Sequence, residues 1–266
     1  MTDDTKMEFE LPIPNTFERI VKLDFNLREI WSYIRLTFLY QKLLGYNKNI
    51  RASIINKEPK ALALIEDVER LKNQIIDENL MQVKAVYQFF KCHAINNEIF
   101  IDFNGKEVVL NFPRQENDPF LCLSDYVAKS NDTIGFLVVT AGHEILDYAK
   151  KIELEGSYKD AFILQGLAIA TSEALAEMIH HQMRIMWGLE EKVERSYDAG
   201  PPRKYLGNRY SFGYPSCPNM EDQEVIWQIL QPEEIEVTLT ESYMMIPEAS
   251  VSAIVFHHPN AKYFNI

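Results

Sequence analysis

The chain has 266 residues, 47% of them hydrophobic and 25% charged, which fits a globular protein with one large domain or two small ones. Its formal net charge of −12 and its lack of any basic stripe exclude a nucleic-acid backbone as partner, because phosphate binding needs clustered cations. No stretch approaches the roughly 18 apolar residues that span a bilayer, and the first thirty residues show no secretory pattern, so we expect no membrane association.

The N-terminal part of the chain reads as helical. The acidic opening, Met1–Glu8, is typical of a frayed terminus. Apolar residues then recur at helical spacing from Asn26 to Gly45 and again from Pro59 to Glu78. We therefore expect residues 1–82 to form a helical N-terminal segment.

The apolar period then changes to that of strands. Runs rich in Val, Ile and Phe occupy Val83–Phe90, Glu98–Phe103 and Glu107–Phe112. Asn104-Gly105 lies between the last two, and Asn-Gly is a strong hairpin signal. These segments predict an antiparallel meander.

A further strand is expected at Thr133–Thr140, followed by Gly142 and a short helix up to Lys151. The longest helical run is Asp160–Trp187, and Gly188 suits its C-terminal end. Residues 189–208 form a charged connector that contains Gly200-Pro201-Pro202.

The C-terminal part completes the predicted sheet. Asn219 is expected to cap a helix that runs to Leu230, and strands follow near Glu236–Glu241 and Ser250–His257. The class is α+β, an antiparallel sheet covered by helices, in a single domain over residues 1–266 whose core is 83–266.

The three cysteines are widely spaced and form no CxxC pair, which indicates reduced thiols and a cytoplasmic protein. They are Cys92, Cys122 and Cys217.

The long helix presents four polar side chains on one face: Glu173, Glu177, His180 and Arg184. One interpretation is a solvated face held by local ion pairs. Another is a metal site, since Glu177 and His180 have the Glu-x-x-His spacing of di-iron bundles, but no second copy of that motif exists. The adjacent pairs His180-His181 and His257-His258 favour structural roles, because neighbouring residues on a strand point to opposite faces.

The densest cluster of binding chemistry is Arg209-Tyr-Ser-Phe-Gly-Tyr-Pro-Ser-Cys217. An arginine presents a planar donor fork that matches a carboxylate. Gly213 lets backbone approach a ligand closely, and Pro215 stiffens the turn. Such a loop suits a small zwitterion with an aromatic base, although a surface Gly-Tyr-Pro turn would look the same.

This loop, with Pro218, resembles the S-adenosylmethionine (AdoMet) loop of the activation domain of cobalamin-dependent methionine synthase. Further segments fall in the order of that family over roughly residues 24 to 266. They are Phe112–Gln115, Cys122–Val127, Ile134–Thr140, Thr240–Ser242 and Lys262–Phe264.

The resemblance implies a binding site and its residues. Arg209 would clamp the carboxylate of AdoMet, the backbone near Ser211 and Gly213 would meet the adenosine, and Tyr263 would close over the ligand. Tyr214 could stabilise the sulfonium by cation–π attraction, worth about 0.5–2 kcal/mol. Glu173 would face the corrin ring, and no catalytic side chain and no metal ligand are expected.

The implied reaction rescues an oxidised cobalamin held by a partner. A reduced flavodoxin-like or other donor converts cob(II)alamin to the cob(I) state, which takes the methyl group of AdoMet. The cobalt is the nucleophile, so the domain supplies position rather than an activated side chain. The cobalamin motif Asp-x-His-x-x-Gly is absent, so we expect a free-standing activation subunit or an excised C-terminal domain.

Two positions depart from the family pattern. Arg35 stands where some members carry an aspartate for the ligand's amino group, and Ile169 replaces another acid. These departures motivate an alternative, a non-catalytic AdoMet-responsive partner of a corrinoid protein.

Overall fold

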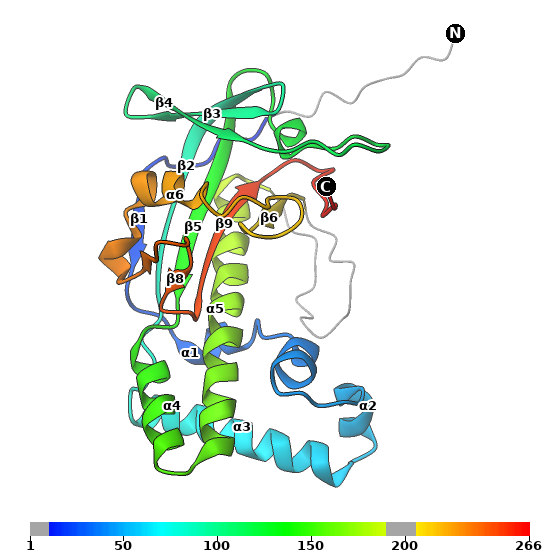
Figure 1. Ribbon diagram of the computed structural model, residues 1–266, viewed down its shortest axis with the longest axis vertical. Helices are drawn as coiled ribbons and strands as arrows, with labels where there is room; N and C mark the ends of the chain where they lie inside the picture. Colours follow the sequence, from blue (N-terminus) through cyan, green and yellow to red (C-terminus); the bar gives the residue numbers. More distant parts are fainter. Residues whose placement is uncertain (1–10, 190–205) are drawn as a thin grey trace.

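The computed structural model describes residues 11–189 and 206–266, so the expected frayed terminus and most of the charged connector lie outside the described residues. Its centre is a seven-stranded antiparallel sheet in the order β4-β3-β2-β5-β9-β6, with β1 paired to β2 (Figure 1). The strands of this sheet are β1 (Ile20–Lys22), β2 (Lys84–Ile95), β3 (Glu98–Phe103), β4 (Lys106–Asn111), β5 (Asp132–Thr140), β6 (Asn208–Tyr210) and β9 (Ser250–Phe256).

The predicted meander is confirmed, with one strand longer than expected. Asn104 and Gly105 have φ values of 55° and 75°, the left-handed backbone that a two-residue hairpin requires. They join β3 to β4 with Phe103 opposite Lys106. β2 continues to Ile95, so one of its edges is shared between β1 and β3, while β5 pairs along the other.

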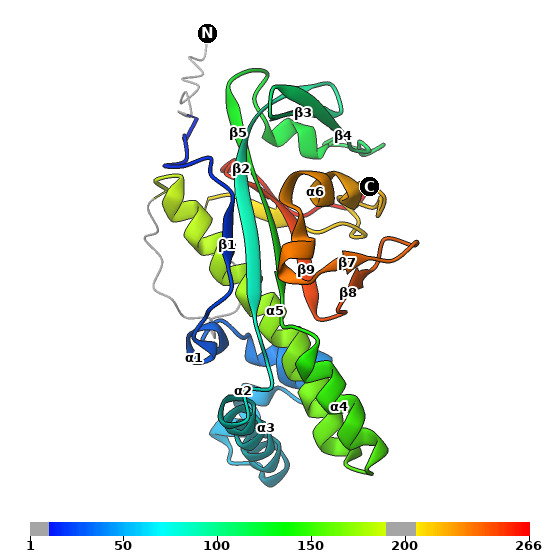
Figure 2. The same cartoon turned by 90° about the vertical axis from the view of Figure 1, so that its left-hand side faces the viewer.

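Both faces of the central strands are buried, which gives the molecule two hydrophobic cores. Side chains alternate along β5: Leu137 and Val139 join the core beneath the long helix, whereas Phe136 and Val138 join the core on the opposite face. All nine residues of β5 are buried. In Figure 2, α6 and the β7–β8 pair lie on one side of the long strands.

The helices cover the sheet and one of its ends. They are α1 (Leu27–Trp31), the π-helix η1 (Thr37–Leu43), α2 (Ile50–Ile55), α3 (Pro59–Asp77), α4 (Glu144–Leu154), α5 (Tyr158–Met186) and α6 (Gln223–Leu230), with 3₁₀ turns η2 (Leu123–Tyr126) and η3 (Pro232–Ile235). Figure 1 shows α2, α3 and α4 gathered at one end of the sheet, with α5 running along it.

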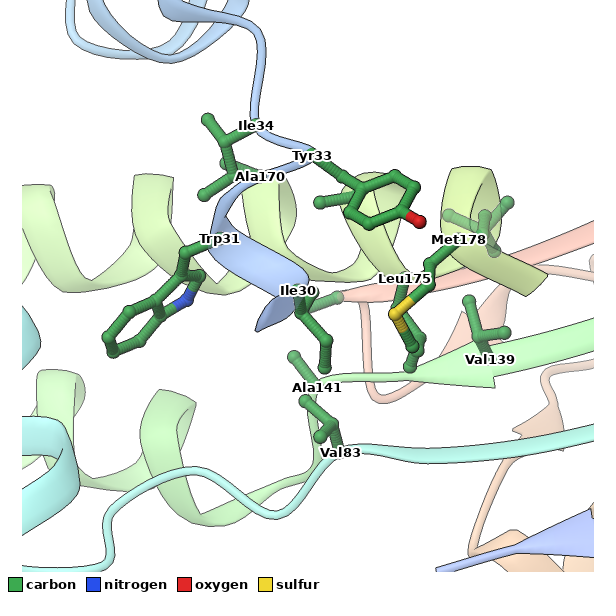
Figure 3. Packing of buried hydrophobic residues seen from close by; sticks show 14 of the residues in the cluster. Ile30, Trp31, Tyr33, Ile34, Val83, Val139, Ala141, Ala170, Leu175 and Met178 are labelled. Atoms are coloured by element: carbon green, nitrogen blue, oxygen red, sulfur yellow. The ribbon is translucent and has the colours of Figure 1, made fainter. Parts of the chain in front are cut away.

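The single helix expected from Asn26 to Gly45 is instead two short helices separated by an irregular stretch. Trp31 Nε1 donates to Thr171 Oγ1 at 3.0 Å, while the Tyr33 hydroxyl meets His181 Nδ1 at 3.2 Å. Thr171 and His181 lie about 15 Å apart along α5 at 1.5 Å per residue. Backbone turns continue as far as Ile34, whose N–H donates to the Trp31 carbonyl at 3.1 Å, and the helix is interrupted after it (Figure 3).

The C-terminal elements need two corrections. Asp222, not Asn219, precedes the first residue of α6, and Asn219 instead accepts a hydrogen bond from the Glu221 backbone. The expected strand at Glu236–Glu241 shrinks to β7 (Thr238–Leu239), which pairs with β8 (Met245–Ile246) in a separate sheet. Left-handed φ values at Gln231 and Glu236 turn this segment away from the main sheet.

Helix α5 corrects the expectation that no stretch is apolar and long enough to span a bilayer. By length and composition it could cross a membrane, but 78% of its 18-residue apolar stretch is buried inside the fold. Isolated polar residues interrupt its apolar run in the sequence. A core helix passes the same test, and α5 packs against β5 and β9.

Candidate functional site

The site centres on Arg209, which β6 places between β9 and the polar face of α5. Arg209 pairs with Val255 of β9, and its backbone N–H donates to Asn208 Oδ1 at 3.0 Å. Its Nη1 donates to Glu177 Oε2 at 2.5 Å, and its Nη2 reaches Glu173 Oε2 at 3.4 Å. The guanidinium therefore lies against two carboxylates that are one helical turn apart on α5.

The electrostatic balance at Arg209 favours its charged form. Burial opposes the charge, but the neighbouring Glu177 and Glu173 carboxylates outweigh burial and raise the pKa of Arg209. Its side chain is only 15% exposed. The result is a fixed, largely desolvated cation with a slight excess of negative charge around it, which suits a ligand that carries both signs of charge.

The loop after β6 is closed by its own backbone. Gly213 N–H donates to the Cys217 carbonyl at 2.8 Å, and Cys217 N–H donates to the Tyr214 carbonyl at 2.8 Å. Gly213 has φ +83°, a conformation that side chains disfavour, and a Cβ there would lie 2.6 Å from Met220 Sδ. The backbone of this loop is thus held in a fixed turn next to Arg209.

The C-terminal tail is bonded to β6 and to this loop at three points. The Tyr263 hydroxyl donates to the Arg209 carbonyl at 2.6 Å, and the Tyr210 hydroxyl donates to the Lys262 carbonyl at 2.8 Å. Phe264 N–H donates to the buried Ser216 Oγ at 3.1 Å. Segments some fifty residues apart in sequence therefore form one unit.

Two of the predicted ligand-contacting residues, one in the loop and one in the tail, are exposed. Tyr214 is 58% exposed and Tyr263 is 64% exposed, so both rings are available to a ligand. Tyr263 also packs edge-on against Tyr210, with ring centroids 5.1 Å apart. Ser211 is half-buried between Tyr210 and the turn.

The polar face of α5 is not the solvated face that one interpretation expected. Glu177, His180 and Arg184 are 7%, 0% and 2% exposed, and Glu173 alone is partly open, at 33% of its side chain. Arg209 of β6 lies against the Glu173 and Glu177 part of this face. Within residues 11–189 and 206–266, no group of three or more His, Cys, Asp or Glu side chains is placed to hold a metal ion.

The two histidine pairs take structural positions. His257 Nε2 lies 2.6 Å from Asp132 Oδ1, and both side chains are 1% exposed. His181 meets Tyr33, as described above. The three cysteines are free and buried, as expected of reduced thiols.

Both departures from the family pattern lie on α5 or the segment along it. Arg35 is exposed, with its guanidinium 5.8 Å from the centre of the Phe38 ring, and Ile169 is half-buried. Neither residue is an acid that could receive an ammonium group.

Sequence reasoning missed three contributors: Glu177 as the closest partner of Arg209, Tyr210 as the link to Lys262, and Ser216 as the anchor of Phe264. Glu177 shares a helix face with Glu173, and this spacing could have indicated that Glu177 belongs to the site. Tyr210 and Ser216 gave none, because their partners are backbone atoms of a remote segment.

Residues 26–266 match the family described as vitamin B12 dependent methionine synthase, activation domain. The methionine synthase of Mycobacterium tuberculosis (strain ATCC 25618 / H37Rv) is 33% identical over 211 residues, covering 71% of this chain and 18% of the relative. That of Mycobacterium leprae (strain TN) is 33% identical over 208 residues, covering 70% of this chain and 17% of the relative. The chain thus spans less than a fifth of the length of these relatives.

A solved structure of the MetH reactivation domain bound to AdoHcy superimposes with a TM-score of 0.86 at 25% identity, covering 97% of this chain and 83% of that one. The mixed fold and the antiparallel sheet are therefore confirmed. Because the family match spans all but the first 25 residues, the chain belongs to the activation-domain family of vitamin B12-dependent methionine synthase.

Proposed function

We propose that this chain binds AdoMet and supports the reductive methylation of a cobalamin held by a partner module. The observation that carries the proposal is the largely buried Arg209 fork, on a strand that leads into the loop of the exposed Tyr214 and whose backbone is bonded to the exposed Tyr263. The similar reactivation domain bound to AdoHcy supports the same ligand class for this site.

Each part of the ligand has a matching group. Arg209 takes the carboxylate, because its planar fork suits a two-pronged contact. Backbone near Ser211 and Gly213 meets the adenosine, and Tyr263 closes over it. Tyr214 offers an aromatic face to the sulfonium cation.

The ammonium group needs hydrogen-bond acceptors, either a backbone carbonyl or an acid, and Glu173 is the acid that fits. It lies 3.4 Å from the Arg209 Nη2 and is partly exposed. A carboxylate and an ammonium on the same carbon would therefore meet Arg209 and Glu173 together. Arg35, in the position where an aspartate was expected from the family, cannot serve.

A corrinoid supplied by the partner would provide the cobalt nucleophile that accepts the methyl group. The chain itself needs no activated base, since its part is to bind and orient AdoMet with the methyl group facing the partner. Glu173, the partly exposed acid on the polar face of α5, is also proposed to border the docking surface of the corrin ring. A reduced flavodoxin-like donor and a cytoplasmic location complete the proposal.

The first test is calorimetric titration of the purified chain with AdoMet, alongside Arg209→Ala. We expect saturable binding that the substitution reduces at least tenfold, because a hydrogen bond to a charged group contributes about 1.5–3 kcal/mol. Arg70→Ala is the matched control, since Arg70 makes an exposed ion pair with Asp160. No binding by the unchanged chain at millimolar AdoMet would contradict the proposal.

A second candidate function is an AdoMet-responsive binding partner of a corrinoid protein that does not support turnover. Arg35 and Ile169, which stand in place of two expected acids, favour it. Cobalamin methylation, measured with a corrinoid partner and a reductant, separates the two candidates. Binding without methyl transfer supports the second.

A further inference from the structure

The two carboxylates beside Arg209 hold it unequally. Glu177 accepts from Nη1 at 2.5 Å, whereas Glu173 lies 3.4 Å from Nη2, near the limit of a hydrogen bond. The Glu177 side chain is 10% exposed and that of Glu173 is 33% exposed. One contact is short and desolvated, and the other is long and open to solvent.

This inequality decides which edge of the guanidinium is available to a ligand. Glu177 occupies the Nη1 side. Nη2 has only the weak contact to Glu173, and Nε makes no hydrogen bond within the described parts of the chain. A carboxylate that binds arginine with two parallel bonds can use the Nη2 and Nε pair without displacing Glu177.

We propose that Glu177 is a positioning residue for ligand binding: it anchors Arg209 through Nη1 and leaves the Nη2–Nε edge for the carboxylate of the amino-acid ligand. This inference rests on the proposed function. Glu177 itself does not touch the ligand.

The roles of the two glutamates follow from their burial. A short ion pair between two largely buried groups is costly to break, because each charge would be left desolvated without its partner. The long contact between Glu173 and Arg209 Nη2 is the one that breaks when a ligand binds. Arg209 therefore keeps its orientation between the free and bound states, and little ordering is left for the ligand to impose.

The test uses three ligands that share the thioadenosine portion and differ in the chain attached to sulfur. AdoHcy carries both carboxylate and ammonium, its deaminated analogue carries the carboxylate alone, and 5′-methylthioadenosine carries neither. Dissociation constants are measured by calorimetry for the unchanged chain and for Glu177→Gln, Glu177→Asp and Glu173→Gln. Amide replacement keeps the size of each side chain and removes its charge.

We expect Glu177→Gln to weaken AdoHcy and the deaminated analogue by a similar factor of about tenfold or more, and to leave 5′-methylthioadenosine unchanged. Glu177→Asp keeps the charge and should recover part of the affinity. Glu173→Gln is the matched control, because it should weaken AdoHcy alone. Retained binding of 5′-methylthioadenosine shows that each variant is folded.

Two results would overturn the inference while leaving the proposed function intact. One is an unchanged affinity of Glu177→Gln for both carboxylate ligands. The other is an equal loss for all three ligands, which would mean that Glu177 supports the whole site rather than the carboxylate contact of Arg209. Failure of the unchanged chain to bind any of the three would instead remove the proposed function, and the inference with it.

Discussion

At the scale of single residues, the site is built from side chains bonded to remote backbone. The Tyr263 hydroxyl donates to the carbonyl of Arg209, although most of the Tyr263 ring is exposed. The bond ties the tail to the residue that we expect to hold the ligand's carboxylate. The hydroxyl bond and the edge-on contact with Tyr210 thus fix the position of Tyr263, while 64% of the residue remains exposed to a ligand.

Tyr263→Phe tests this arrangement. Removing the hydroxyl leaves the ring but loses one hydrogen bond, worth about 0.5–1.5 kcal/mol. We expect AdoMet affinity to fall by a few-fold in calorimetry, with little change in the melting temperature because the residue is exposed. Tyr158→Phe, in an exposed tyrosine at the start of α5, is the control. An unchanged affinity would show that the tail does not order the site.

The Asp132–His257 pair makes stability depend on pH. Burial acts against the Asp132 charge, but hydrogen bonds from His257, Ala128 and Thr133 outweigh it and lower the pKa of Asp132. A carboxyl whose folded pKa is depressed contributes stability above its unfolded pKa of about 3.9, and loses it as the pH falls through the folded value.

We therefore expect Asp132→Asn to cost about 1.5–3 kcal/mol at neutral pH and to flatten the loss of stability below about pH 4. Urea unfolding at several pH values measures both effects. Asp125→Asn is the comparison, because Asp125 also has a lowered pKa but is more exposed beside Arg114. Parallel acid profiles for the unchanged chain and Asp132→Asn would contradict the assignment.

At the scale of elements, helices and strands could be predicted from the sequence where the apolar spacing and the turn residues agreed. The Asn104-Gly105 hairpin, α3, β5 and β9 were all predictable, because their apolar spacing and their bounding residues point the same way. The strand β6 was not. It is three residues long, too short to show alternation, and only its pairing with β9 defines it.

Gly207 is what allows β6 to approach β9. Its φ is +84°, and a Cβ there would lie 2.2 Å from the Phe256 carbonyl oxygen, which is backbone and cannot rotate away. Gly207→Ala must therefore shift β6, and with it Arg209. This close contact involves no side chain, so the sequence pattern did not predict it.

Gly156→Ala is the matched comparison for Gly207→Ala. Gly156 has φ +94°, but nothing lies within 4 Å of the added Cβ, so that variant reports backbone strain alone, about 1–2 kcal/mol. We expect Gly207→Ala to destabilise the chain further and to weaken AdoMet binding, which Gly156→Ala should not affect. Equal free energies of unfolding for the two variants would contradict the role given to Gly207.

At the scale of the whole molecule, the fold and the site rest on different parts of the chain. One core joins the sheet to α5 and the N-terminal helices, and the other joins it to α6 and the η2 and η3 turns. Sequence period predicted much of both. The site instead joins β6, α5 and the tail after β9. These three segments come together only through the order of strands in the sheet, which no local pattern specifies. The resemblance to a known family implied that Arg209 and Tyr263 contact the same ligand, which residue chemistry alone left open.

This separation predicts that the tail can be removed without loss of the fold. Ending the chain at Ala261 deletes the partners of Tyr210 and Ser216 but leaves β9, which ends at Phe256, intact. We expect a cooperative unfolding transition at a lower melting temperature, because Phe264 packs against the second core.

The shortened chain should, however, lose its response to ligand. A ligand at one hundred times its dissociation constant stabilises the folded state by about 2.7 kcal/mol, so the full chain should melt at a clearly higher temperature in excess AdoMet. Without Tyr263 and the tail backbone, Arg209 keeps its charge but loses the residues that would close over the ligand. The rise in melting temperature on adding AdoMet should therefore be small. Equal rises in melting temperature for both chains would mean that β6 and α5 alone form the binding site. The tail would then only stabilise the fold.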